Sequence, residues 1–310
     1  MKKYLNPHCF MLNSLAMGDV IAAAPVVKHM VENYYTDPGS YMVVAKQAFR
    51  PILHFIPDSN FHDFDKKENT WGIPADFAIS ILNTKKDYLT RNTPKHMTLG
   101  QFASLKLADR MLSPKDYHYV PLKKVDVSHL GVNFKETVIL VTSYRDATRA
   151  WHADSVLAVA KYIRGKGLTP VFIGKTDMDI ATHLIPKTSL PESAGVFGID
   201  LRNKTSVPEL ATLMGQAVAV CGIDSGPIHI AGTTSVPIVC GYTSVSPEHR
   251  IPSRPRGKTY PVVPKTPCIG CESKLESHFW NFEDCYLGHI NCCKDMTPNL
   301  FIDELEKILG

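Results

Sequence analysis

Short apolar runs alternate with segments of helical periodicity in both halves of the chain. The apolar runs suit strands that are buried on both faces of a sheet. They cover residues 10–12, 41–45, 77–82, 138–142, 170–173, 218–223 and 237–240. The segments between them predict helices at residues 19–35, 47–55, 153–166, 207–215, 227–233 and 299–309. Two successive alternations predict two doubly wound α/β domains, each built on a parallel sheet.

The boundary between these domains is predicted within residues 123–135, a polar stretch without helical periodicity. We therefore assign residues 1–130 and 131–310 to the two domains, since a chain of 310 residues suffices for two units of about 150. No apolar run approaches the roughly 18 to 20 residues of a membrane span, which predicts a cytoplasmic protein without stable membrane insertion. The net charge of +4 is compatible with acidic partners but distinguishes none of them.

One turn carries a carboxylate between a buried strand and the start of a helix. Residues 220–241 read VCGIDSGPIHIAGTTSVPIVCG, in which Asp224, Ser225 and Gly226 form the turn. Pro227 suits the first helical position. A helix that begins here directs unpaired N–H groups and the positive end of its dipole beyond the strand, so the pattern predicts an anion site. His229 lies on the first turn of the same helix; packing in the core is the alternative for this side chain.

A second polar loop, SYRDATR at residues 143–149, directly follows another predicted strand. Ser143 supplies a hydroxyl, and Arg145 and Arg149 supply guanidinium groups whose geometry matches phosphate oxygens. Pairing of Arg145 with Asp146 or another surface acid is the alternative. We expect Asp224 to orient Arg149, His229 or backbone donors.

Four segments, in the same order along the chain, resemble the signature of glycosyltransferase family nine, the bacterial ADP-heptose:lipopolysaccharide heptosyltransferases. They are residues 14–25 (SLAMGDVIAAAP), 138–151 (VILVTSYRDATRAW), 220–241 and 285–298 (CYLGHINCCKDMTP). The resemblance implies a GT-B architecture, in which two Rossmann-like doubly wound domains face a central cleft. The first domain would bind the acceptor and the second the nucleotide sugar, with a C-terminal helix that packs back on the first domain.

The resemblance also implies an inverting transfer from a nucleotide-diphosphate sugar, a co-substrate, without a cofactor or a catalytic metal. Asp19 would be the base that deprotonates the acceptor hydroxyl; capping of its helix is the alternative role. An aspartate of ordinary pKa, about 4, is a weak base at neutral pH, so burial or other carboxylates would have to raise it. Arg149 stands where the family usually has a lysine, two residues before Trp151.

Further residues are assigned to the donor nucleoside and to the acceptor. The loops that follow the second domain's strands suggest Gly174, Asp177, Lys204 and Thr205 for the nucleoside, although solvated turns have the same composition. The acceptor set combines the Ser14 to Gly18 turn with the basic side chains of a segment after the third strand of the first domain: Lys85, Lys86 and Arg91.

Eight cysteines in 310 residues do not indicate a disulfide scaffold. Cys221 and Cys240 lie in apolar strand contexts and are predicted to be core residues. The last third of the chain holds a candidate structural metal site, for which buried thiols or a disulfide are the alternatives: Cys268, Cys271, Cys285 and Cys292.

Two acceptors and two further classes of protein stay open at this stage. A lipopolysaccharide inner-core sugar is the family default. The short first domain also resembles small phage-encoded members, which would transfer a sugar to 5-hydroxymethylated pyrimidines such as hydroxymethylcytosine in DNA, reached by base flipping. A sugar-nucleotide hydrolase or epimerase on the same fold is a second class. A non-catalytic binding protein is a third, against which Asp19, Arg149 and Asp224 together argue.

Overall fold

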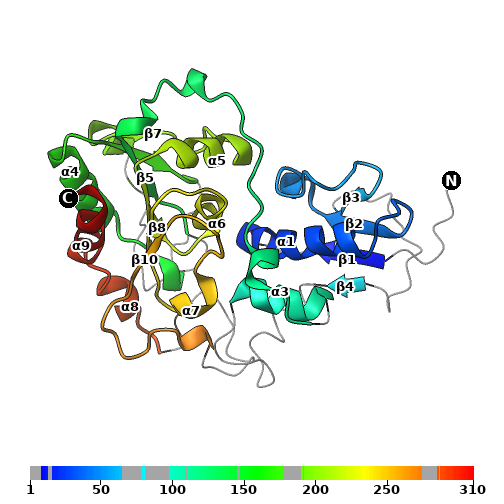
Figure 1. Ribbon diagram of the computed structural model, residues 1–310. Coiled ribbons are helices and arrows are strands. Elements are labelled where there is room, and N and C mark those ends of the chain that lie inside the picture. Colours follow the sequence, from blue (N-terminus) through cyan, green and yellow to red (C-terminus); the bar gives the residue numbers. More distant parts are fainter. Residues whose placement is uncertain are drawn as a thin grey trace. The chain divides into compact units, whose positions relative to one another are not determined.

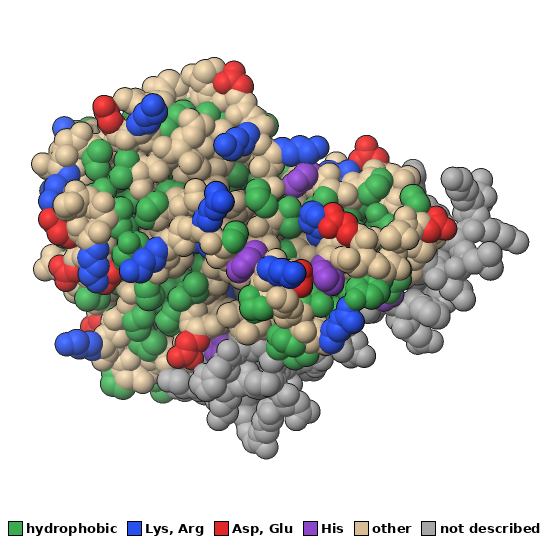
Figure 2. All heavy atoms as spheres, viewed as in Figure 1, with side chains coloured by type: hydrophobic (Ala, Val, Ile, Leu, Met, Phe, Trp, Pro, Cys, Tyr) green, Lys and Arg blue, Asp and Glu red, His purple; other side chains and the backbone are tan. Residues whose placement is uncertain are grey.

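The computed structural model describes residues 8–12, 16–64, 78–80, 98–108, 110–144, 147–176, 190, 192–273, 285 and 287–310. The chain divides into two compact units, Met1–Lys123 and Lys124–Gly310. Figure 1 shows both as α/β units. On the face drawn in Figure 2, Lys and Arg side chains are interspersed with Asp and Glu, in keeping with the small net charge. None of the described helices is long and apolar enough to cross a membrane.

The first unit contains a parallel sheet in the order β3-β2-β1-β4. Its strands are β1 (His8–Leu12), β2 (Tyr41–Ala45), β3 (Phe61–Asp63) and β4 (Ala78–Ser80). Two helices, α1 (Met17–Asn33) and α3 (Leu99–Ala108), pack on each other. Strands β2 and β3 both lie on one side of β1, and β4 lies on the other. The order of connection therefore reverses between β1 and β4. Helix α1 directly follows β1 in the chain.

The helix predicted at residues 47–55 is wrong beyond its first turn. A 3₁₀ turn spans Gln47–Phe49, and turns follow as far as Ile56. Pro51 has no N–H to continue a helical ladder. The guanidinium of Arg50 instead donates to the carbonyl oxygens of Leu53 and Ile56, at 2.6 and 2.7 Å. These side-chain hydrogen bonds satisfy carbonyl groups that a helix would have paired.

The second unit contains a six-stranded parallel sheet in the order β10-β9-β8-β5-β6-β7. The strands are β5 (Thr137–Val141), β6 (Thr169–Ile173), β7 (Ile199–Asp200), β8 (Ala219–Ile223), β9 (Ile238–Gly241) and β10 (Thr259–Val262). The helices are α4 (Ala153–Gly165), α5 (Val207–Gln216), α6 (Gly226–Gly232), α7 (Pro247–Arg250), α8 (Asn291–Lys294) and α9 (Pro298–Leu309). Counted from β5, the order is the Rossmann order, with its reversal between β5 and β8.

Helices cover both faces of this sheet (Figure 1). Helices α4 and α9 pack together on one face, and α5 and α6 pack together on the other. The core is apolar and includes Trp151 and Phe301, whose ring centroids are 4.4 Å apart. The buried residues of the last helix, Phe301 and Leu305, lie in the core of the second unit, where the apolar face of the helix covers α4 and strands β8 to β10.

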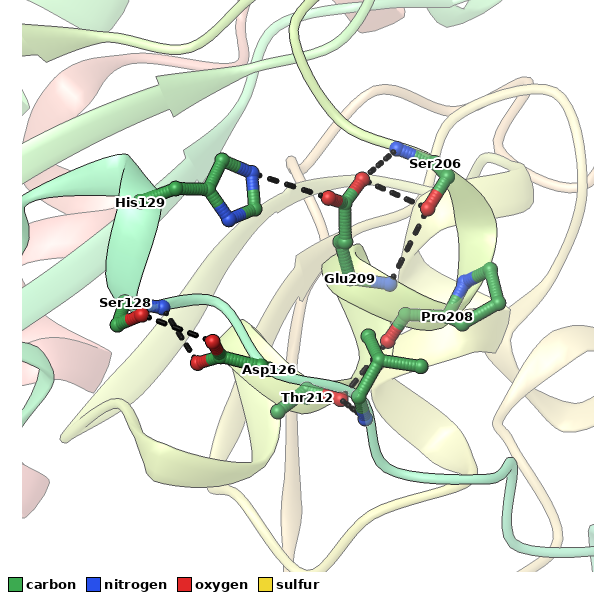
Figure 3. A network of polar contacts seen from close by, with 8 residues as sticks. Asp126, Ser128, His129, Ser206, Pro208, Glu209 and Thr212 are labelled. Carbon is green, nitrogen blue, oxygen red and sulfur yellow. Dashed lines mark hydrogen bonds and ion pairs between the residues drawn. The ribbon is translucent and has the colours of Figure 1, made fainter.

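The segment that begins the second unit is held on α5 (Figure 3). The N–H of Val125 donates to the Thr212 hydroxyl at 3.1 Å, and His129 lies 3.1 Å from the Glu209 carboxylate. Glu209 also forms a capping box with Ser206, whose hydroxyl accepts the Glu209 N–H while the carboxylate accepts the Ser206 N–H. The sequence SVPE at the start of α5 thus caps the helix through Ser206 and Glu209. Through Glu209 it also binds His129, in the segment that leads to the second sheet.

Candidate functional site

Two polar loops follow neighbouring strands at the point where the strand order of the second sheet reverses. In open parallel sheets, the loops that follow two neighbouring strands diverge where the order reverses, and ligands bind in the resulting crevice. Strand β5 leads into the loop that ends with the 3₁₀ turn Ala147–Arg149. Strand β8 leads into Asp224 and Ser225, at the start of α6. Both loops carry residues that the sequence assigned to a phosphate site.

Asp224 is the buried anion at the centre of this site. The residue is 3% exposed, and its N–H donates to the Gly241 carbonyl at 3.0 Å. One carboxylate oxygen, Oδ1, lies 3.3 Å from Nε2 of His229, and the other, Oδ2, lies 3.4 Å from Nη1 of Arg149. As expected, Asp224 therefore holds both Arg149 and His229. The imidazole of His229 is buried as well.

The neighbours of Asp224 keep its carboxylate ionised. Burial acts to raise its pKa, but the hydrogen bond from His229 and the positive charges of Arg149 and Arg250 outweigh burial. The pKa of Asp224 therefore lies well below its ordinary value. Arg250 ends α7, which follows β9, so a third loop on the same edge of the sheet contributes charge to the site.

Arg149 lies between two carboxylates. Besides Asp224, its guanidinium contacts Glu272, with 3.1 Å between Nη2 and Oε2. Its backbone is fixed as well, because the Thr243 hydroxyl donates to the Thr148 carbonyl at 2.6 Å. Among the residues at this end of the sheet, Glu272, Arg250 and Thr243 were missed by the sequence reasoning. The sequence could have indicated Thr243 and Arg250, because residues 237–250 repeat the pattern of a strand, a polar turn and a proline at the start of a helix.

Two hydroxyls beside Asp224 and Arg149 are buried without a hydrogen-bond partner among the described residues: those of Ser225 and Thr148. Ser225 stands at the N-cap of α6 in an extended conformation, but its side chain does not cap the helix. Because an unsatisfied buried polar group costs free energy, such hydroxyls mark a place where a ligand oxygen is favoured. The charge of Arg149 beside them favours an anion.

The loops assigned to the nucleoside lie next to the phosphate loop. Gly174, at φ +130°, approaches Ser143 so closely that a Cβ there would lie 2.8 Å from the serine's Cβ. Its carbonyl accepts the N–H of Asn203 at 2.9 Å, which joins this loop to the one that holds Lys204 and Thr205. The ammonium of Lys204 is bonded to the Asp200 carbonyl at 2.8 Å. Asp177 lies outside the described residues, as does Arg145 of the phosphate loop.

In the first unit, Asp19 occupies the third position of α1 and is 7% exposed. The N-cap is Ala16, so Asp19 is not the capping residue. A carboxylate in the first turn is stabilised by the helix dipole. Gly18 precedes it, also buried, at the edge where the order of the first sheet reverses. The other residues assigned to the acceptor lie outside the described residues: Ser14, Lys85, Lys86 and Arg91.

The late cysteines pack beneath the phosphate loop. Cys292 and Cys293 share a buried cluster with Tyr144, Ala147 and Ala150, and the Cys293 thiol donates to the Ala147 carbonyl at 3.5 Å. None of the eight cysteines, which all lie in described parts of the chain, forms a disulfide. Cys221 and Cys240 are buried core residues, as predicted.

Of the four cysteines of the candidate metal site, Cys271 lies within electrostatic reach of the other three. Burial, followed by the charges of Glu272 and of the other three thiols, raises the pKa of Cys271 to about 12. Within the part of the chain that the structure describes, however, no three Cys, His, Asp or Glu side chains are gathered as a metal ion requires. The donor set suits zinc or iron chemically.

The arrangement of strands and helices is similar to that of solved glycosyltransferases. A glycosyl transferase family 9 protein from Veillonella parvula DSM 2008 gives a TM-score of 0.66 at 14% identity, covering 98% of both chains. The dodecameric, iron-containing glycosyltransferase TibC from enterotoxigenic E. coli H10407 gives 0.71 at 15% identity, covering 97% of this chain and 78% of that one. ADP-heptose LPS heptosyltransferase II of E. coli gives 0.57 at 14% identity, covering 97% and 98%.

These similarities place the chain in the GT-B fold class, with two Rossmann-like units of parallel sheet. Residues 96–277 match the family model described as glycosyltransferase family 9 (heptosyltransferase). This match spans more than half of the chain, which therefore belongs to glycosyltransferase family 9, a family of transferases. No curated protein matches the chain in sequence.

Replacing Asp224 by Asn should lower the free energy of unfolding by about 3 kcal/mol, because removing one partner of a buried ion pair leaves uncompensated charge. Chemical denaturation at pH 7 measures this loss. Since the pKa of Asp224 is lowered in the folded protein, its stabilisation is present above about pH 4 and is lost as the pH falls below that value. The difference in the free energy of unfolding between Asp224→Asn and the unmodified protein should therefore become smaller as the pH falls.

Glu306→Gln is the matched control, because Glu306 forms an exposed ion pair with Lys166 at 2.7 Å in the same unit. Surface pairs contribute about 0 to 1 kcal/mol. If Asp224→Asn lowers the free energy of unfolding no more than Glu306→Gln does, Asp224 does not form the stabilising buried ion pair described above.

Proposed function

We propose that this protein transfers a sugar from a nucleotide-diphosphate sugar to an acceptor hydroxyl, with inversion at the anomeric carbon and without a catalytic metal. The observation that carries the proposal is the cluster at the ends of β5 and β8. Arg149 is held there by buried Asp224, beside the hydroxyls of Ser225 and Thr148, which have no hydrogen-bond partner in the described part of the chain. Cationic and hydroxyl donors in a partly buried place suit a diphosphate that gains charge as it leaves.

The donor most strongly supported is ADP-heptose. Two solved family relatives, TibC and the E. coli heptosyltransferase WaaC, are described in complex with ADP-D-β-D-heptose and with ADP. In this chain, Arg149, Ser225 and the Gly226 N–H would bind the diphosphate, and His229 would stay with Asp224 or donate to a phosphate oxygen. Ser143 and Arg145 complete the proposed phosphate set. Gly174, Asp177, Lys204 and Thr205 remain the proposed nucleoside residues.

The base is proposed to be Asp19. The acceptor hydroxyl would give its proton to the Asp19 carboxylate while its oxygen attacks the anomeric carbon from the face opposite the diphosphate. The bond between that carbon and the diphosphate oxygen breaks in the same step, and Arg149 stabilises the charge that the leaving group gains. No step is assigned to a metal, because the arginines can supply the positive charge.

The acceptor is proposed to be an inner-core sugar of lipopolysaccharide, with hydroxymethylated DNA as the competing acceptor and hydrolysis of the donor as the competing reaction. One experiment separates them. The protein is incubated in EDTA with ADP-heptose, then with ADP-, UDP-, GDP- and CMP-sugars, and with either truncated lipopolysaccharide or hydroxymethylcytosine DNA. A mass gain on lipopolysaccharide supports the proposal, and a gain on DNA replaces its acceptor. Nucleotide release without any acceptor indicates a hydrolase, and activity that appears only on adding Mg²⁺ or Mn²⁺ overturns metal independence.

Asp19→Asn should lower kcat by about 10² to 10⁴-fold, the usual contribution of a general base. Donor affinity should stay unchanged, because the proposed donor residues all belong to the second unit. Steady-state kinetics and calorimetric titration with ADP measure the two quantities. Near-normal turnover would leave Asp19 with a helix-stabilising role and require another base.

Arg149→Ala should impair both donor binding and transfer, because the diphosphate is present in the ground state and gains charge on leaving. We expect a loss of about 2 to 4 kcal/mol in transition-state stabilisation, measured as the change in kcat/KM for the donor. Arg149→Lys should recover part of the activity, since it restores the charge but not the guanidinium fork. Kinetics of Arg149→Ala equal to those of the unmodified protein would remove this loop from the donor site.

A further inference from the structure

Glu272 connects three segments that meet beside the proposed donor site. It lies in the 3₁₀ turn Cys271–Ser273, directly after the Cys-x2-Cys pair. One carboxylate oxygen accepts from Arg149, and the other accepts from the Ser244 hydroxyl. The Glu272 N–H also donates to the Ser244 carbonyl at 2.9 Å. The Glu272 side chain is 13% exposed and the Arg149 side chain 12%, so solvent screens their 3.1 Å contact only in part.

The partners of Glu272 are themselves fixed. The Gly270 N–H donates to the Thr243 carbonyl at 2.9 Å, and the Thr243 hydroxyl donates to the Thr148 carbonyl at 2.6 Å. The turn after β9 is thereby bound both to the phosphate loop and to the Cys-x2-Cys turn. Ser244, which bonds Glu272, is itself 2% exposed. The Glu272 carboxylate is consequently held in one place before any ligand binds.

We propose that Glu272 is a positioning residue for the donor diphosphate, which it serves by holding the Arg149 guanidinium against Asp224. The proposal rests on the donor site described under the proposed function. A guanidinium has five N–H donors in a planar fork, so contacts with two carboxylates can fix its orientation. An arginine side chain that is already ordered loses less conformational entropy when the ligand binds.

The contact between Glu272 and Arg149 could also oppose donor binding, so the direction in which the Kd changes distinguishes the two roles. Glu272 carries a negative charge beside the proposed place of an anion and engages the arginine that would bind it. If Glu272 only occupied Arg149 until the donor arrived, its removal would strengthen donor binding. The hydrogen bond from the Ser244 hydroxyl and the low exposure of Glu272 favour a fixed carboxylate, so we expect its removal to weaken donor binding.

The test is calorimetric titration of ADP into Glu272→Ala, Glu272→Gln and the unmodified protein, with Glu306→Gln as a control away from the site. Glu272→Ala should raise the Kd for ADP about tenfold or more, the scale of one charge-assisted hydrogen bond. Glu272→Gln, which keeps the shape and an acceptor for Ser244 but loses the charge, should lie between. In assays with the donor sugar, KM should rise more than kcat falls.

A double-mutant cycle with Arg149→Ala separates positioning from general stability. In the Arg149→Ala background, Glu272→Ala should no longer raise the Kd for ADP, because the side chain that Glu272 positions is gone and only the repulsion between its charge and the anion is removed. Equal losses in both backgrounds, or tighter binding of ADP by Glu272→Ala, would overturn the proposal. If the unmodified protein binds neither ADP, UDP nor GDP, the proposed function fails, and this inference fails with it. If the unmodified protein binds ADP and Glu272→Ala binds it equally well, the inference alone fails.

Discussion

The buried charge of Asp224 is the constraint on which the second unit's functional edge depends. A carboxylate that is 3% exposed persists in ionised form only where other groups compensate it. The compensation comes from Arg149 after β5, His229 after β8 and Arg250 after β9. The loops that follow three strands therefore contribute positive charge that compensates this one carboxylate. Any ligand that binds here meets donors already arranged, which is the physical basis of the proposed donor site.

The order of the strands explains where these loops lie. Both sheets reverse their order of connection beside their first strand, between β1 and β4 in one unit and between β5 and β8 in the other. The polar residues that the sequence places after those strands, Asp19 in the first unit and Arg149 and Asp224 in the second, lie at these positions. The cysteine-rich end of the chain adds a support beneath the phosphate loop through Cys293 and Ala147. Stability and the proposed chemistry thus use the same few contacts.

Sequence patterns predicted the features that depend on neighbouring residues. Strands β5 and β8 are continuous apolar runs, and Asp224 and His229 are only five residues apart, so their pairing follows from one turn and one helix. Glu272 could not be found in this way, because its contact with Arg149 spans 123 residues and depends on how β9 and the cysteine turn pack. The two-residue strand β7 is too short to leave a periodic signal. The spacing of apolar residues at 47–55 is typical of a helix, but this spacing does not show that Pro51 lacks the N–H that a helix needs.

A crystal structure of the protein with ADP tests the central claim most directly, because the claim concerns where a diphosphate binds. The account predicts phosphate oxygens within about 3 Å of the Arg149 guanidinium and the Ser225 hydroxyl, with the pairing of Asp224 and Arg149 retained. A diphosphate bound away from the ends of β5 and β8, with the Ser225 hydroxyl still without a partner, would contradict it.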